Sequence, residues 1–366
     1  MINLQRQRIL VVGGGVVGAM LAYRLSEQAQ VTLLDKQAPA QGSTGAALGV
    51  SMGAISRKTK GRAWAMRQQS MGDFDTLIEA LQQCTDQTIA YNRSGIVKLL
   101  FEGDDRDRWV TLAQTRREQG WPLMLWDRDE LQARCPSISL SSDRFGAVSG
   151  AVHSPCDRQV HPQQLTLALL EAARGRGATT RFDAQVKAVD GPGVTLAGGE
   201  YLTADWVILT AGLGTAALAA QKTIDIRPVL GQAVEVQLPQ PLSSGAFGPV
   251  MTGHDIHIVP VNPTDPSEAR YWVGATVEFP EGEDEPAAVE AERQAMWAGA
   301  IALCPALQQA AIVRHWWGKR PRPYNRPAPI IEVLPESRVV VASGHYRNGV
   351  LLAPATARKV LELLDL

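Results

Sequence analysis

The feature that most constrains the fold is a glycine-rich turn between an apolar segment and a helical pattern near the start of the chain. Residues 9–12 read Ile-Leu-Val-Val, which is typical of a strand buried on both faces. Gly13, Gly15 and Gly18 follow in the spacing G-x-G-x-x-G, and a second apolar run ends in Asp35. Strand, glycine turn, helix, strand and acid in this order predict a βαβ unit that binds a dinucleotide.

Each of these positions has a physical reason in a nucleotide site. Gly13 permits the tight turn, Gly15 allows the backbone to approach a pyrophosphate, and Gly18 lets the helix pack close to the strand. The first N–H groups of the helix then face the phosphates. Asp35 can accept hydrogen bonds from a ribose diol and disfavours a 2′-phosphate. The motif alone does not choose between FAD and NAD, and a glycine-rich turn without a ligand is the plainer alternative.

Two further segments of small residues are candidates for close approach to a ligand. Residues 41–50 are rich in glycine, alanine, serine and threonine, which form a poor core but can cradle a flat or phosphorylated ligand. An ordinary surface loop explains their composition about as well. The segment 204–212 reads as a buried strand with a small-residue exit, ending in Ala211 and Gly212, which could return the chain to the nucleotide-binding sheet. A buried strand ending in a plain turn is the alternative there.

The alternation of elements predicts an α/β protein of two interwoven domains, for which 366 residues are sufficient. We expect a cofactor domain from residues 1–84, 147–217 and 333–366, and a second domain from residues 85–146 and 218–332. Hydrophobic periodicity predicts helices over 62–84, 104–119, 127–134, 162–175 and 290–304, with a last helix near the end of the chain. Strands are predicted at 96–101, 123–126, 184–189, 193–196, 233–236, 257–261, 271–276 and 339–342.

Composition excludes several classes of protein. A formal net charge of −1 gives no support for nucleic acid or an anionic membrane as partner. No apolar run approaches the roughly 20 residues that span a bilayer, and the polar start of the chain does not resemble a signal peptide. Four scattered cysteines suggest neither a disulfide framework nor a zinc site. We therefore expect a cytoplasmic protein without a metal.

Seven strings distributed along the chain resemble those of one family, the D-amino-acid-oxidase-like flavoproteins, and within it the bacterial glycine oxidases of thiamine biosynthesis. The last string is the most specific, whereas the glycine fingerprint alone is much less so. The strings are VVGGGVVG (11–18), SGIVKL (94–99), VILTAG (207–212), RPVLGQ (227–232), VGATVE (273–278), WWGKRP (316–321) and GHYRNGVLLAPAT (344–356).

The resemblance implies an FAD enzyme with a Rossmann-like cofactor domain and an antiparallel-sheet substrate domain. Related sarcosine oxidases attach the flavin through a cysteine, and residues 322–327 contain none, so we expect non-covalent FAD. Homo-oligomers occur among related enzymes, and one is possible here. Besides Gly13, Gly15, Gly18, Ala211 and Gly212, the expected cofactor-binding residues are Val16, Val17, Asp35, Lys36, Ser43, Thr44, Leu48, Gly49, Val50, Val186, His345, Tyr346, Arg347, Asn348, Gly349, Val350 and Leu351.

The resemblance also implies that Arg320 and Arg347 hold a substrate carboxylate. Arg347 precedes the last helix, where the helix dipole disfavours a cation, and a carboxylate bound by its planar fork explains the position. His257 stands where glycine oxidases have a tyrosine, Asp255 replaces a histidine, and Val277 replaces a larger methionine. His257 is a candidate substrate-binding residue that could titrate near neutral pH, or a strand histidine that points away.

The implied reaction is oxidation of a small amino acid or N-substituted glycine, with hydride transfer to flavin N5 and molecular oxygen as electron acceptor. No side chain has to act as acid or base, since positioning carries most of the catalysis. A D-amino-acid or D-proline dehydrogenase that passes electrons to a quinone or carrier is one alternative. An NAD-dependent dehydrogenase and a nucleotide-binding module without catalysis are the others.

Overall fold

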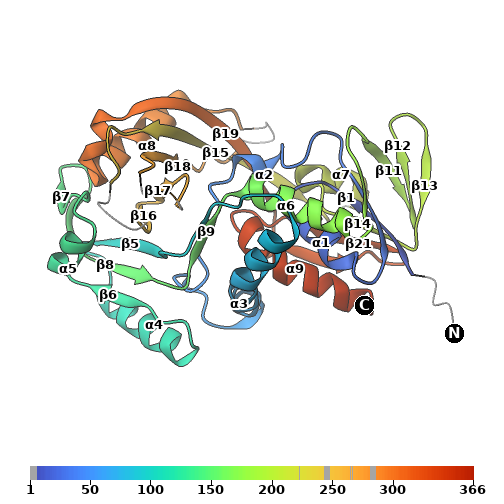
Figure 1. Cartoon of the computed structure of the whole chain (residues 1–366), viewed down its shortest axis with the longest axis horizontal. Helices are drawn as coiled ribbons and strands as arrows, with labels where there is room; N and C mark the ends of the chain where they lie inside the picture. The colour runs from blue at the N-terminus through green and yellow to red at the C-terminus, as the bar shows by residue number, and fades with distance from the viewer. Residues whose placement is uncertain (1–5, 222, 243–247, 264, 266, 281–285) are drawn as a thin grey trace.

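Two large sheets lie side by side in the computed structural model, which describes residues 6–221, 223–242, 248–263, 265, 267–280 and 286–366 (Figure 1). One sheet has six strands and the other nine. A small sheet lies between them and consists of β3 (Val50–Ser51), β9 (Arg158–Val160) and β4 (Tyr91–Asn92). Its strands come from three distant parts of the chain, so it ties the two halves together.

The six-stranded sheet carries the predicted βαβ unit. Its β14 pairs in parallel with β1, so the segment 204–212 does return the chain to this sheet. Alternate residues of β1 enter different cores: Ile9 and Val11 pack on the helical side, Leu10 and Val12 on the other. All pairings are parallel except that of β20 with β21. In spatial order the strands are β10 (Thr179–Arg181), β2 (Gln30–Leu34), β1 (Arg8–Val12), β14 (Trp206–Leu209), β21 (Val339–Ser343) and β20 (Ile330–Val333).

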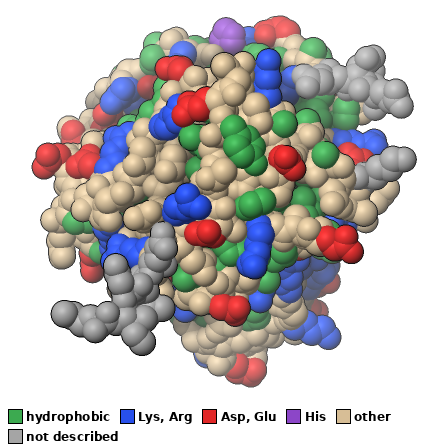
Figure 2. All heavy atoms as spheres, turned by 90° about the vertical axis from the view of Figure 1, so that its right-hand side faces the viewer, with side chains coloured by type: hydrophobic (Ala, Val, Ile, Leu, Met, Phe, Trp, Pro, Cys, Tyr) green, Lys and Arg blue, Asp and Glu red, His purple; other side chains and the backbone are tan. Residues whose placement is uncertain are grey.

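Helices cover one face of this sheet, and a small antiparallel sheet covers the other. On the helical face α1 (Val16–Leu25) packs against α6 (Pro162–Gly175) and α9 (Gly349–Leu363), and α3 (Gly61–Cys84) packs against α9. The opposite face is covered by β11 (Val186–Asp190), β12 (Gly193–Leu196), β13 (Tyr201–Thr203) and α7 (Thr215–Ala219). At this end of the molecule positive and negative side chains are interspersed on the surface (Figure 2).

The nine-stranded sheet is antiparallel apart from the parallel pair β16–β5. One face packs on α8 (Glu290–Leu303) and α5 (Arg128–Arg134) through a second core, and α4 (Arg106–Glu118) lies beside β6. In spatial order the strands are β19 (Ala311–Pro323), β15 (Ile226–Gln237), β18 (Arg270–Gly274), β17 (Ile256–Pro260), β16 (Val250–Gly253), β5 (Ile96–Phe101), β8 (Gly146–Ser154) and β6 (Met124–Trp126), with β7 (Ser141–Ser142) beside β8.

The predicted fold class is confirmed, and most predicted elements lie within a few residues of their observed bounds. Four strands of the nine-stranded sheet were not predicted, the short β7 and β16 and the longer β8 and β19. The edge strand β19 is exposed on both faces in its first half, and β8 is rich in glycine, so neither shows clear alternation. The domain division stays a prediction; it assigns residues 147–154 to the cofactor domain, whereas β8 lies in the nine-stranded sheet. Among the described residues no helix is long and apolar enough to cross a membrane.

Candidate active site

The glycine turn is packed so tightly that side chains are excluded. Gly13 has φ +118°, and a Cβ on Gly18 would lie 1.9 Å from the Gly13 carbonyl oxygen. The hydroxyl of Thr210 lies 2.9 Å from the Val12 carbonyl oxygen and 3.0 Å from that of Gly13. Thr210 thus fixes the turn from β14. It lies in the string VILTAG, but only its contacts in the fold mark it as a site residue.

Helix α1 begins at this turn with unsatisfied donors. The residue that precedes the helix is Gly15, which has no side chain to cap it, and the first turn of the helix contains no acid. The N–H of Val16 donates to the Thr44 hydroxyl at 3.1 Å, while Val17 and Gly18 have no intrahelical acceptor at this end. The helix end is positive and has free N–H groups, and the glycine turn lets a ligand come close to the backbone. Both features suit the diphosphate of FAD.

The acid after β2 is held by backbone groups beside the turn. Asp35 accepts hydrogen bonds from the Gly14 and Gln37 N–H groups. Lys36 is exposed. Ala184 donates its N–H to the Asp35 carbonyl oxygen at 2.8 Å, and β11 begins two residues later, at Val186. The structure therefore brings the residues expected at the ribose and adenine to one region, and their roles there stay predictions.

The segment 43–50 packs directly on the nine-stranded sheet. The Ser43 hydroxyl donates to the Lys319 carbonyl oxygen at 2.7 Å, and Trp316 Nε1 donates to the Ala46 carbonyl oxygen at 3.1 Å. A Cβ on Gly318 would lie 2.2 Å from Ala46 Cβ. We call residues 43–50 the cradle; β19 supports it from the other half of the molecule.

One row of in-register residues crosses the sheet on the face that meets the cradle. A Cβ on Gly274 would lie 3.2 Å from Leu48 Cδ1, so the missing side chain makes room for the cradle. Because paired residues in neighbouring strands project to the same side, the whole row faces that way. From β5 to β19 the row is Lys98, Thr252, His257, Gly274, Ala233 and Trp316.

The two predicted carboxylate-binding arginines converge beside this row. Arg320 lies on the same side of β19 as Trp316, and it donates to the carbonyl oxygens of Leu230 at 2.9 Å and Thr276 at 3.1 Å. Burial lowers the pKa of Arg320, and the positive charge of Arg347 lowers that pKa further. Two guanidinium groups that repel each other in a partly buried place favour an anion between them.

Arg347 comes from the turn before α9 and reaches the hairpin between β16 and β17. Its Nη1 lies 3.4 Å from Asp255 Oδ1, with 38% of the arginine side chain and 72% of the aspartate side chain exposed. An ion pair this exposed contributes little stability. Arg347 therefore remains available for a ligand carboxylate.

His257 lies in the in-register row, on the side of the sheet that meets the cradle, and its contact with a substrate stays a prediction. Its Nδ1 is buried without a hydrogen-bond partner among the described residues. Burial lowers the pKa of His257 to about 4, with Arg347, Lys98 and Arg320 also lowering it and Asp255 raising it. A pKa this low keeps the imidazole neutral at physiological pH and disfavours titration near neutrality.

The string 345–351 forms the turn into α9. His345 is buried with Nε2 2.8 Å from the Thr356 hydroxyl, and burial lowers its pKa to about 3. Tyr346 has φ +55° and donates its N–H to the Pro321 carbonyl oxygen at 2.9 Å. Helix α9 begins at Gly349, so the N–H groups of its first turn lack intrahelical acceptors, as a flavin-binding helix end requires.

Two buried ionisable residues, neither of them predicted as a site residue from the sequence, fix the loop after the cradle. Asp157 accepts the N–H groups of residues 53–55 at 2.7 to 2.9 Å. Arg116 is fully buried over the Trp64 ring and donates to the carbonyl oxygens of residues 54, 56 and 58. Neither residue carries a sequence signal, because each bonds to backbone distant along the chain.

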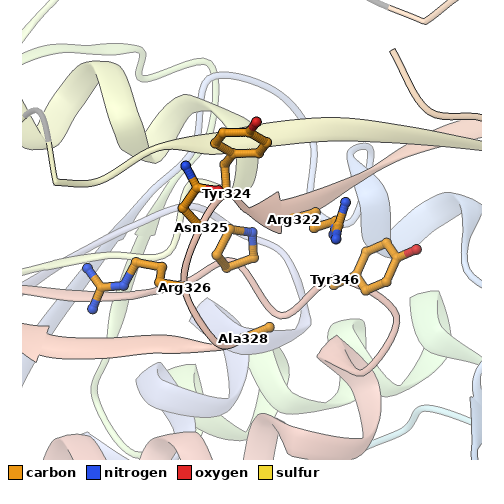
Figure 3. Close-up of a pocket in the computed structure, with 7 residues that line it drawn as sticks. Arg322, Tyr324, Asn325, Arg326, Ala328 and Tyr346 are labelled. Atoms are coloured by element: carbon orange, nitrogen blue, oxygen red, sulfur yellow. The ribbon is translucent and has the colours of Figure 1, made fainter. Parts of the chain in front are cut away.

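A pocket of about 470 Å³ opens beside Tyr346 (Figure 3). The side chains of Arg322 and Tyr346 lie next to each other in it, with the guanidinium carbon 5.8 Å from the ring centroid. Its other lining residues belong to β19 or the loop that follows: Pro323, Tyr324, Asn325, Arg326 and Ala328.

The Rossmann-like sheet carries a glycine turn and a helix without a side-chain cap, and the neighbouring sheet carries two converging arginines. These features together define a dinucleotide-dependent enzyme. The sequence model of one family, the FAD dependent oxidoreductases (DAO), matches residues 8–363. The chain belongs to this family, and it is an FAD-dependent oxidoreductase. The predicted resemblance and cofactor are thereby confirmed, and the NAD alternative is excluded.

Relatives of known name match nearly end to end. The chain is 29% identical over 370 residues to a glycine oxidase of Geobacillus kaustophilus, covering 98% of this chain and 93% of that protein. The solved structure of a glycine oxidase from that organism superimposes with a TM-score of 0.85 at 28% identity, over 98% of this chain and 95% of that one. The bifunctional protein ThiO/ThiG of Synechocystis is 28% identical over 97% of this chain, which spans only 51% of that protein.

Proposed function

We propose that this enzyme oxidises the C–N bond of a small amino acid or N-substituted glycine, giving an oxo acid, ammonia or an amine, and hydrogen peroxide. The observation that carries the proposal is the convergence of Arg320 and Arg347 at the cradle-facing side of the sheet. The names of the glycine oxidase and ThiO/ThiG relatives support it and suggest a place in thiamine biosynthesis.

The residues of the chain act by positioning. Arg347 and Arg320 hold the carboxylate, which fixes the carbon that bears the amine relative to the cradle. Neutral His257 adds a hydrogen-bonding group without charge beside that carbon. The bound FAD supplies a two-electron acceptor, and the N–H groups at the start of α9 would stabilise negative charge on its pyrimidine edge.

The overall reaction consumes one amino acid, one oxygen molecule and one water molecule. The α-hydrogen leaves the carbon with two electrons and one proton leaves the nitrogen, water hydrolyses the resulting imine, and oxygen takes up the two electrons and two protons to give hydrogen peroxide. Because the α-hydrogen leaves as hydride rather than as a proton, no general base is needed at the α-carbon. The two acids that act on Arg320 are bonded elsewhere: Asp255 is ion-paired with Arg347, and Glu278 accepts a hydrogen bond from Gln232.

A dehydrogenase that passes electrons to a quinone or carrier is the second candidate. The test is steady-state turnover with glycine, sarcosine, D-alanine, D-proline and bulkier N-substituted glycines, measured as oxygen uptake, peroxide and oxo acid. Equal yields of peroxide and oxo acid support the oxidase. Turnover only with an artificial quinone or dye favours the dehydrogenase, and no turnover with either acceptor favours a protein without catalysis.

A further inference from the structure

The backbone around Arg320 fixes where its guanidinium lies. Nη1 donates to the Leu230 carbonyl oxygen at 2.9 Å, and Nη2 donates to the Thr276 carbonyl oxygen at 3.1 Å. The guanidinium also covers Gly231, where a Cβ would lie 2.1 to 2.4 Å from three of its atoms. Three strings that resemble the family therefore meet at this one side chain: WWGKRP, RPVLGQ and VGATVE.

The contacts of Arg320 leave a fixed set of donors for a ligand. Within the described residues the guanidinium forms no ion pair, and its two backbone bonds use two of its five N–H groups. The other three donors point in directions that those bonds determine. Since a carboxylate binds to a planar fork through two oxygens at once, the backbone around the guanidinium decides where the carboxylate can lie.

Thr276 is held in turn by a ring of hydrogen bonds. The Gln232 N–H donates to the Thr276 hydroxyl at 2.8 Å, and that hydroxyl donates to Glu278 Oε1. The side-chain amide of Gln232 donates to the same carboxylate oxygen at 3.0 Å, which closes the ring. Thr276 and Gln232 are buried and Glu278 is half-buried, so these bonds lie largely away from water.

Three donors converge on the Glu278 carboxylate. Besides the Thr276 hydroxyl and the Gln232 amide, the N–H of Val289 donates to Oε2 at 3.0 Å. A carboxylate suits such a place because it only accepts hydrogen bonds, whereas an amide would turn its own N–H groups towards one of these donors. The position therefore favours an acid over an amide of the same size.

We propose that Glu278 is a positioning residue: through Thr276 it holds the Arg320 guanidinium against Gly231, with the free donors directed to the substrate carboxylate. The inference rests on the function proposed above, in which Arg320 binds that carboxylate. In this role Glu278 does not touch the substrate and acts only through Arg320. The bond from Val289 also joins the start of α8 to the sheet, so positioning has to be separated from stability.

Binding of the ether methoxyacetate, which has a carboxylate and no amine, measures the carboxylate site through perturbation of the flavin spectrum. Glu278→Gln should weaken this binding about 10-fold, because a displaced guanidinium loses part of a charge-assisted contact. Thr276→Val should weaken it about as much, whereas Thr276→Ser keeps the hydroxyl and should stay within about twofold of the wild-type affinity. Gly231→Ala places a methyl group against the guanidinium and should weaken binding at least about 10-fold.

A double-mutant cycle separates the positioning of Arg320 from a general effect on the sheet. In an Arg320→Met background, Glu278→Gln should weaken methoxyacetate binding by less than about twofold more, because the arginine through which it acts is gone. A general effect would weaken binding by the same factor in both backgrounds.

Glu171→Gln is the matched control. Glu171 is also half-buried and accepts one backbone N–H and one glutamine amide, from Asp86 and Gln87 at 2.8 and 2.7 Å, but it lies on α6. This change should alter methoxyacetate affinity less than about twofold. Retained FAD and urea denaturation check the folding of every variant.

Wild-type affinity in Glu278→Gln, or an equal loss with and without Arg320, would overturn the inference. A wild-type enzyme that does not bind methoxyacetate would overturn it as well. If Glu278→Gln loses its FAD, the two Thr276 variants decide, and equal affinities of Thr276→Val and Thr276→Ser would overturn the inference. If binding depends on Glu278 as expected but no amine reduces the flavin, the positioning stands and the proposed function fails. If amines are oxidised but Glu278→Gln binds methoxyacetate normally, the function stands and this inference fails.

Discussion

Two regions meet at the candidate site and are built from different chemistry. One is the glycine turn with the cradle; the other is the cradle-facing side of the nine-stranded sheet, which we call the substrate face because of its proposed role. The cradle side uses backbone: Gly13, Gly18 and the first turn of α1 leave room and N–H groups where a side chain would clash. The substrate face uses side chains from strands far apart in sequence: His257 lies in the row of paired residues, and Arg320 lies beside that row on β19. Backbone sites tolerate almost no substitution, whereas a side-chain face can change specificity one residue at a time.

The largest effect should come from a side chain added at the glycine turn. Gly18→Ala places a methyl group 1.9 Å from the Gly13 carbonyl oxygen, so α1 must move away from the strand. We expect loss of bound FAD and a fall in the free energy of unfolding of about 3 kcal/mol. Flavin content after purification and urea denaturation measure the two effects.

Gly72→Ala is the matched control, because Gly72 lies within α3 and its Cβ would meet nothing within 4 Å. This change should raise the free energy of unfolding by about 0.5–1 kcal/mol and leave flavin content unchanged. Similar behaviour of the two variants would show that the turn does not need its glycine.

The next effect concerns the loop that joins the two regions. Asp157→Ala leaves three N–H groups of residues 53–55 without an acceptor. We expect the free energy of unfolding to fall by about 3 kcal/mol, with faster hydrogen exchange at those amides. A loss below about 0.5 kcal/mol, typical of surface positions, would mean that the loop does not depend on this carboxylate.

On the substrate face, Arg347→Met should separate binding of the substrate from binding of the cofactor. We expect methoxyacetate, an ether analogue of sarcosine that has no amine to oxidise, to bind about 10–100-fold more weakly, because one charge-assisted contact is lost. Flavin content should fall far less than in Gly18→Ala, because the backbone N–H groups of this turn remain in place. Arg338→Met, an exposed arginine over Trp206, is the control and should change neither quantity. Loss of flavin in Arg347→Met would contradict the division between the two regions.

The smallest effect is a pH dependence of stability. The pKa of His257 is about 4 in the folded protein, below its ordinary value, so between about pH 6.5 and 4 the unfolded chain binds a proton that the folded chain does not. Stability should therefore fall by about 1–2 kcal/mol as the pH falls through this range. His257→Gln should flatten the slope there and leave stability at neutral pH nearly unchanged; an unaltered slope would contradict the assignment.

The two regions also differ in how far sequence could predict them. The glycine turn, its helix and Asp35 follow one another within thirty residues, so local spacing identifies them. Thr252, His257 and Gly274 become neighbours only through strand register, and Thr210 and Asp157 act on backbone groups that no local pattern identifies. The resemblance to a family supplied Arg320 and Arg347, which lie on β19 and before α9 and which no local pattern brings together.

Anaerobic reduction of the bound flavin tests the central claim most directly. The wild-type enzyme is mixed with each amine of the panel and followed at about 450 nm, where oxidised flavin absorbs. The account predicts rapid bleaching by at least one small carboxylate-bearing amine, and bleaching at least about 10-fold slower at the same concentration in Arg347→Met. Flavin that dithionite reduces but no amine bleaches, or equal rates in the two proteins, would contradict it.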